Sequence, residues 1–83
     1  VYESENIKLS IYPNPSQGSI TIEFDNEGLY RMSIYDLLGS LIKRVENISS
    51  DKIVIEKESM VPGNYFIEVK SDKTTIKRKI RIE

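Results

Sequence analysis

The stretch Tyr12-Pro13-Asn14-Pro15-Ser16-Gln17-Gly18 separates two segments in which apolar and polar side chains alternate. Each of its two prolines fixes φ at about −65° and removes a backbone hydrogen-bond donor, while Asn14 and Gly18 suit turn positions with positive φ. Neither a strand nor a helix can continue through such a stretch. Residues 7–11 before it and 19–24 after it alternate with a period of two, which is typical of half-buried strands. The stretch therefore predicts a rigid corner between two β-strands.

The same alternation continues to the end of the chain and predicts further strands at residues 29–35, 40–46, 52–57, 64–70 and 74–82. Every second side chain of such a strand points to the same face. The expected inward residues are Ile7, Leu9, Ile11, Ile20, Ile22, Phe24, Tyr30, Met32, Ile34, Ile53, Ile55, Tyr65, Ile67, Val69, Ile76, Ile80 and Ile82. About seven short strands with turns at regular spacing predict an all-β fold, an antiparallel β-sandwich.

Turn residues interrupt the alternation between the expected strands. In Asp36-Leu37-Leu38-Gly39, the Asp36 carboxylate can accept hydrogen bonds from backbone amides, and Gly39 can adopt positive φ. The one place where a helical turn can form is the pair Leu37-Leu38 with Leu41-Ile42. The other expected turns lie at residues 25–28, 47–51, 60–63 and 71–73.

The 83-residue length fits one domain with a small core. Residues 1–6 are polar and acidic without periodicity, and we interpret them as a linker remnant before a sandwich over residues 7–83. Because the chain begins with Val1 rather than Met, we expect it to be a segment of a longer polypeptide. The net charge of −1 creates no overall field for nucleic acid or an anionic membrane, and no apolar run is long enough to span a bilayer.

Histidine and cysteine are both absent, which removes the commonest general base, the commonest nitrogen ligand and the thiolate nucleophile. We therefore expect no enzyme, no cofactor and no metal site. Two carboxylate pairs, Asp25 with Glu27 and Glu56 with Glu58, lie at or beside expected turns, where solvated charges are the simpler interpretation. Asp25, Asn26 and Glu27 offer oxygen atoms to Ca²⁺, but the spacing of a calcium-binding loop is missing.

Three aromatic side chains on outward positions suggest a second class of function, carbohydrate binding. They are Tyr12, Tyr35 and Phe66. A row of rings stacks well on sugar faces, whereas the alternative is that these rings cover the edges of the sandwich. The sequence leaves both interpretations open.

The last expected strand carries a basic row on its outward face, formed by Lys77, Lys79 and Arg81, and Arg78 interrupts its isoleucine-lined inward face. Six of the twelve basic side chains of the chain lie within residues 70–81. One interpretation is an edge strand that charge protects against unwanted pairing. The other is a recognition strand that is presented to a receptor.

Three segments together resemble the type A C-terminal sorting domain of the type IX (Por) secretion system. They are Ile11-Tyr12-Pro13-Asn14-Pro15 with Gly18, Ile34-Tyr35-Asp36 with Gly39, and Pro62-Gly63-Asn64-Tyr65 before a basic and apolar last strand. The family motif residues in this sequence are Tyr12, Pro13, Asn14, Pro15, Gly18, Asp36, Gly39, Gly63 and Tyr65. Those that match its terminal strand, the expected translocon contact, are Lys77, Lys79, Ile80, Arg81 and Ile82. Glu83 departs from the basic or apolar ending expected of the family.

The resemblance implies an immunoglobulin-like sandwich that acts as a sorting signal at the C-terminus of a secreted protein. Such a domain directs an N-terminal passenger through the outer-membrane translocon, and a sortase-like protease at the cell surface then removes it. The expected partners are this secretion machinery and the passenger, without nucleic acid or a small-molecule ligand. The expected location is the periplasm, in transit to the outer membrane, the cell surface or the medium. An immunoglobulin-like or carbohydrate-binding accessory module of a secreted protein is the alternative.

Overall fold

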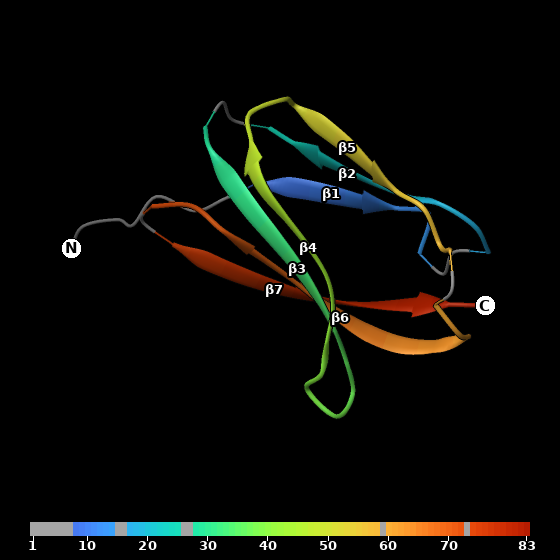
Figure 1. The fold of residues 1–83 in the computed structure, drawn as a ribbon. Coiled ribbons are helices and arrows are strands. Elements are labelled where there is room, and N and C mark those ends of the chain that lie inside the picture. The colour runs from blue at the N-terminus through green and yellow to red at the C-terminus, as the bar shows by residue number, and fades with distance from the viewer. Residues whose placement is uncertain (1–7, 15–16, 26–27, 59, 73) are drawn as a thin grey trace.

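Seven β-strands form two antiparallel sheets in the computed structural model, which describes residues 8–14, 17–25, 28–58, 60–72 and 74–83 (Figure 1). The strands are β1 (Leu9–Tyr12), β2 (Ile20–Phe24), β3 (Tyr30–Asp36), β4 (Leu41–Ile48), β5 (Lys52–Ile55), β6 (Gly63–Lys70) and β7 (Thr75–Ile82). The three-stranded sheet has the order β1-β2-β5, and the four-stranded sheet has the order β4-β3-β6-β7. The described residues contain no helix, and so none that crosses a membrane. The all-β sandwich predicted from the sequence is confirmed.

The core lies between the two sheets and is lined by the alternating apolar side chains that the sequence predicted. Every predicted inward residue that the structure describes is buried or partly buried, while Ile7 lies outside the described residues. Ile22 and Met32 face the core from different sheets, and neither has exposed surface. The rings of Phe24 and Tyr30, one from each sheet, stack with centroids 4.3 Å apart. The period-two pattern therefore specifies which face of each sheet is withdrawn from water.

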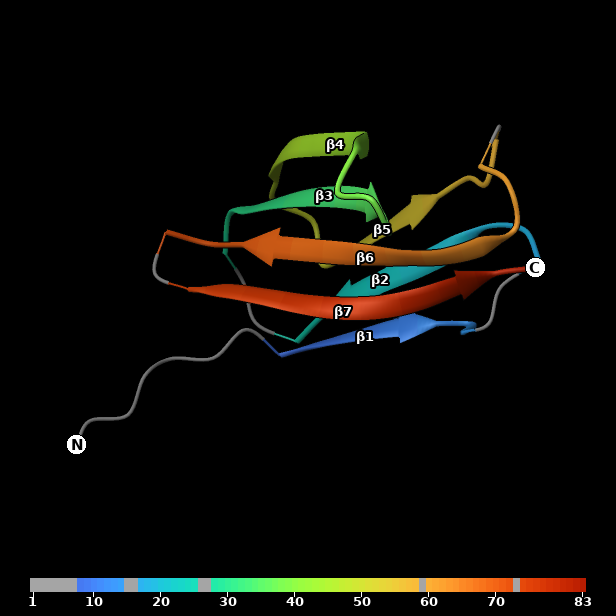
Figure 2. The same cartoon turned by 90° about the horizontal axis from the view of Figure 1, so that it is seen from below.

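The strand order is that of an immunoglobulin-like sandwich. The first, second and fifth strands form one sheet, and β3, β6 and β7 form the other, where β4 is added at the edge beside β3. Figure 2 shows β7 and β1, the edge strands of the two sheets, along the same side of the sandwich. The corner that follows β1 therefore lies beside the end of the chain.

The prediction of a polar turn over residues 47–51 is wrong for residues 47 and 48, because both belong to β4. The pairing of β3 with β4 shifts between Tyr30 and Met32, so that Tyr30 pairs with Ile48. Asn47 takes φ of 58° at this irregularity, a conformation that asparagine tolerates better than most residues. The extra residue turns Ile48 inward, where it is 4% exposed and belongs to the core.

Other predicted boundaries shift by one or two residues. Tyr12, assigned to the corner from the sequence, is the last residue of β1 and pairs with Thr21. The strand expected over residues 52–57 ends at Ile55, and Asp36 extends the third strand. Leu37 and Leu38 form a hairpin turn between β3 and β4 rather than a turn of helix.

Candidate functional site

The Asn14 side chain of the corner is bonded to the outer edge of β7. Its Nδ2 donates to the carbonyl oxygen of Lys79 at 3.3 Å, and the Arg81 N–H donates to its Oδ1 at 3.1 Å. These two backbone groups flank Ile80 and point away from β6. A neighbouring strand would bond the same two groups. One amide side chain therefore takes the place of a strand partner and joins the two ends of the chain.

Tyr12 fixes the other side of this corner. Its hydroxyl donates to Glu23 Oε1 at 2.8 Å, which connects β1 to β2 on the outward face of the three-stranded sheet. This hydrogen bond to a carboxylate raises the pKa of the Tyr12 phenol above its ordinary value, with smaller contributions from desolvation and the Glu23 charge. Pro13 and Gly18 are exposed in the corner, and Pro15 lies outside the described residues.

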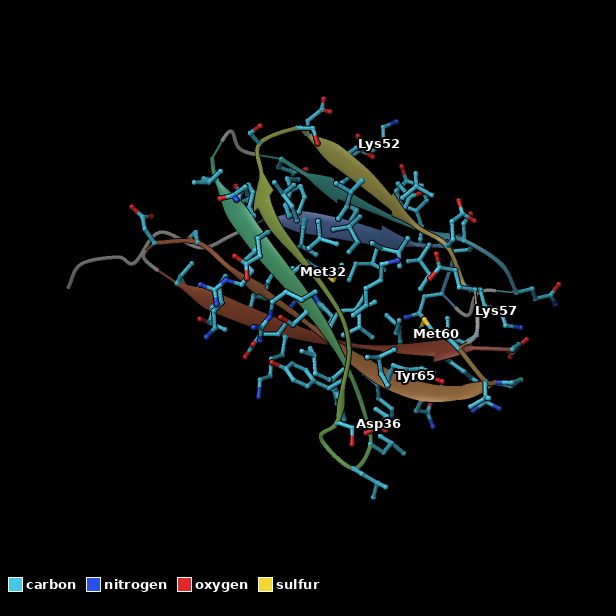
Figure 3. The ribbon with its side chains drawn as sticks, in the orientation of Figure 1. Met32, Asp36, Lys52, Lys57, Met60 and Tyr65 are labelled. Atoms are coloured by element: carbon cyan, nitrogen blue, oxygen red, sulfur yellow. The ribbon has the colours of Figure 1, made fainter. Side chains whose placement is uncertain are left out.

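Asp36 organises the hairpin turn between β3 and β4, which projects from the sandwich in Figure 3. Its Oδ1 accepts hydrogen bonds from the Leu38 N–H at 3.0 Å and the Ser40 N–H at 2.9 Å. The Gly39 N–H donates to the Asp36 carbonyl, and Gly39 has φ of 88°. Both roles that the sequence predicted for this turn are confirmed. The turn leaves Leu37 60% exposed and Leu38 92% exposed.

Tyr65 fixes the approach to β6 in the manner of the tyrosine corner of immunoglobulin-like domains. Tyr65 is 4% exposed and belongs to the core, as does Met60, and its hydroxyl donates to the Val61 carbonyl at 2.5 Å. Gly63, between them, has φ of 153°, which only glycine adopts without strain. The third motif is therefore a packing and hydrogen-bonding unit that sets where β6 begins.

The motifs lie on one line across the four-stranded sheet. Asp36 pairs with Tyr65, and Tyr65 pairs with Ile80 on β7. Asn14 bonds the backbone on both sides of that same Ile80. Residues far apart in the sequence therefore converge on the terminal strand. Sequence reasoning assigned each motif to its own turn and missed this convergence.

The terminal strand β7 separates its side chains into two sets. Lys77, Lys79 and Arg81 are exposed on the outward face, as predicted, whereas Ile80 and Ile82 are 2% and 1% exposed. In the folded domain the two isoleucine side chains belong to the core, and the side chains of the basic row remain accessible to solvent. Arg78, expected to interrupt the inward face, is exposed, and its Nη1 donates to the Lys77 carbonyl at 3.3 Å.

The last residue is held in place as well. Lys57 Nζ donates to the main-chain oxygen of Glu83 at 3.0 Å, and Arg81 Nε lies 3.4 Å from Glu83 Oε2. Glu83, which departs from the resemblance, thus has two basic partners in this fold.

The three rings considered for sugar binding do not form one row. Tyr12 lies on the outward face of the three-stranded sheet, whereas Tyr35 and Phe66 are paired neighbours on the four-stranded sheet. Among the described residues there is also no group of three or more Asp or Glu side chains placed to hold a metal ion. Asn26 and Glu27 of the considered calcium loop lie outside the described residues.

These features define a class of protein: an immunoglobulin-like β-sandwich whose terminal strand carries an exposed basic row and is held by a signature corner. The sequence model of the family described as "Secretion system C-terminal sorting domain" matches residues 10–83. The chain belongs to this family, and the domain is a C-terminal sorting signal of the type IX secretion system. Comparison with curated proteins gives no match. The family implies export toward the outer membrane or cell surface and involvement with the type IX machinery and an N-terminal passenger.

Proposed function

We propose that this domain guides a passenger fused to its N-terminus to the outer-membrane translocon, and that the outward row of β7 contacts the export machinery. The observation that carries the proposal is that one face of β7 is buried and the other is exposed. Ile80 and Ile82 hold the strand in the core, while Lys77, Lys79 and Arg81 remain exposed beside them. A strand fixed in this way presents its charges at constant spacing, which favours recognition by charge pattern.

We propose further that a sortase-like protease at the cell surface removes the domain after passage through the outer membrane. The cleavage point lies before the sandwich, in or near the linker expected over residues 1–6. The domain acts as a non-catalytic tag that resides in the periplasm during transit. A ligand of low molecular mass or a nucleic acid has no part in this role.

A reporter fusion tests the proposal in a cell that has a type IX secretion system. The wild-type domain, fused behind a periplasmic reporter, is expected to bring the reporter to the surface or the medium. Deletion of residues 77–83 is expected to stop export, but this deletion also removes the buried Ile80 and Ile82 and therefore the fold. The sharper variant is Lys77→Gln/Lys79→Gln, which removes charge and leaves the core intact.

The matched control is Lys8→Gln/Lys52→Gln, which removes the same charge from exposed positions beside or within the three-stranded sheet. We expect export to fall severalfold for the β7 variant and to stay at the wild-type level for the control. Equal export of both variants would show that the β7 row is not the contact. A wild-type fusion that stays in the periplasm would overturn the sorting role of this chain.

A further inference from the structure

The outward face of the four-stranded sheet is strongly positive, although the whole chain has a net charge of −1. Strand pairing places six exposed basic residues on this face: Arg31, Arg44, Lys70, Lys77, Lys79 and Arg81. Its carboxylates are Glu68, Glu83 beside Arg81 and, by alternation along β4 from Arg44, Glu46. The face thus has a formal charge of +3, whereas the outward face of the three-stranded sheet balances Glu23 against Lys52.

Most of these positive charges lack an acidic partner among the described residues. In the part of the chain that the structure describes, Arg81 lies within 4 Å of a carboxylate oxygen, that of Glu83, and the other five basic residues of the face do not. Unpaired charges of one sign on one face attract a partner of the opposite sign and raise its rate of association. The charge pattern therefore extends beyond β7 to β3, β4 and β6.

A hollow of about 440 Å³ lies on this face beside the hairpin turn between β3 and β4. Its floor is the cross-strand pair of Tyr35 and Phe66, and the hairpin turn closes one end with Leu37. Lys77 and Glu68, paired across β6 and β7, form the opposite end. Leu37 is 60% exposed and Phe66 37% exposed, so apolar surface remains in contact with water here.

We infer that this hollow docks an acidic protein surface, with one apolar side chain of the partner seated on Tyr35 and Phe66 and carboxylates around it facing the basic residues. The inference rests on the proposed sorting function and names the chemistry of the partner. An apolar anchor in a pocket with a charged rim is the arrangement that gives protein interfaces both affinity and orientation. The hairpin is rigid enough to serve as one wall because Asp36 and Gly39 fix its turn.

The concave shape favours a protein over a lipid surface. A bilayer presents a flat array of headgroups, which would meet the basic residues but leave the hollow unfilled. A protein side chain fills it and removes the exposed surface of Phe66 and Leu37 from water.

Two short synthetic peptides test the chemistry directly with the full chain. In one, Asp and Glu residues flank a single Leu, and in the other Ser replaces that Leu. Backbone amide shifts are expected to change at Tyr35, Phe66 and Lys77 with the Leu peptide, and binding is expected to be about tenfold weaker with the Ser peptide. Equal binding of both peptides would overturn the anchor, and no shift on this face would overturn the docking site.

Variants separate this face from the rest of the domain. Phe66→Ser is expected to weaken binding of the Leu peptide about tenfold, and Lys77→Glu/Lys79→Glu is expected to abolish it. Lys8→Glu/Lys52→Glu, with the same change in charge, is expected to bind like the wild type. Thermal unfolding of each variant establishes that it folds, and Lys79→Glu alone replaces the double variant if that one does not. Vesicles of phosphatidylglycerol that bind through the same residues more tightly than the Leu peptide would overturn the protein partner in favour of a lipid surface.

The reporter fusion distinguishes failure of the docking-face inference from failure of the proposed sorting function. If the wild type is exported and Phe66→Ser and Lys77→Glu/Lys79→Glu are exported equally well, the docking face is wrong while sorting stands. If the wild type is not exported, the sorting function itself fails.

Discussion

Replacing Asn14 with alanine should release the outer edge of β7 near its C-terminal end. The wild-type amide bonds the Lys79 carbonyl and the Arg81 N–H, and alanine can make neither bond. A typical hydrogen bond contributes about 0.5–1.5 kcal/mol net to stability. Asn14 is exposed, so both bonds belong to the lower part of that range, and we expect a loss of about 1–2 kcal/mol. For a domain of this size each kcal/mol lowers Tm by roughly 4–8 °C.

Two measurements check this expectation. Urea unfolding gives the change in stability, and hydrogen exchange of individual amides gives its location. The Arg81 amide should lose most of its protection in Asn14→Ala, while the Ile80 amide, which faces β6, should keep much more. Asn14→Asp keeps an acceptor for the Arg81 N–H but loses the donor to Lys79, so Arg81 should remain protected in that variant.

Gln17→Ala is the matched control, because Gln17 is exposed in the same corner. It should change neither the stability nor the exchange of Arg81 by a measurable amount. Asn14→Ala with wild-type stability and an unchanged Arg81 amide would refute the reasoning, since it would mean that the corner does not hold β7. A loss of stability without any local change at Arg81 would refute it as well.

Three further predictions concern the other supports of the fold. Gly39→Ala should destabilise the domain by about 1–2 kcal/mol in urea unfolding, because φ is 88° although open space surrounds the added Cβ; Gly39→Asn should cost less. Tyr65→Phe should cost about 1 kcal/mol by the same assay because it removes the bond to the Val61 carbonyl, and a cost near zero would show that the ring alone fixes this corner. The raised pKa of Tyr12 means that the folded state holds the phenolic proton more tightly than the unfolded chain does. This contribution to stability should be present below about pH 10 and lost as pH rises through the folded pKa, so the wild type should lose stability above that pH more steeply than Tyr12→Phe.

The sequence predicted the local features well because each depends on neighbouring residues. Alternation predicted that Ile22 and Ile67 face the core. The ability of the Asp36 carboxylate to accept backbone hydrogen bonds and of Gly39 to adopt positive φ predicted the hairpin turn. Ile48 was missed because its inward direction depends on an irregularity at Asn47, which breaks the period of two.

The features that could not be predicted depend on which strands become neighbours. The bonds of Asn14 to β7 join residues 65 and 67 positions apart in the sequence. The hollow requires the pairing of Tyr35 with Phe66, and this pairing follows from the register of β3 with β6 rather than from either segment alone. The alternation predicted that both rings point outward, but it predicted the same for Tyr12. The sheet order places Tyr12 on the opposite side of the sandwich.

The convergence of the motifs on one line explains how structural residues can serve recognition without touching a partner. Asp36 on β3 pairs with Tyr65 on β6, and Tyr65 pairs with Ile80 on β7. Asn14 bonds the backbone on both sides of Ile80. A disturbance at any of these positions loosens β7, and with it the spacing of the basic residues that flank Ile80. Export should therefore fall in Asn14→Ala and in Tyr65→Phe in proportion to the lost protection of β7 amides, although neither change alters a charge of the docking face. Export that follows overall stability but not the protection of β7 would show that these motifs support the fold in general rather than the presentation of this strand.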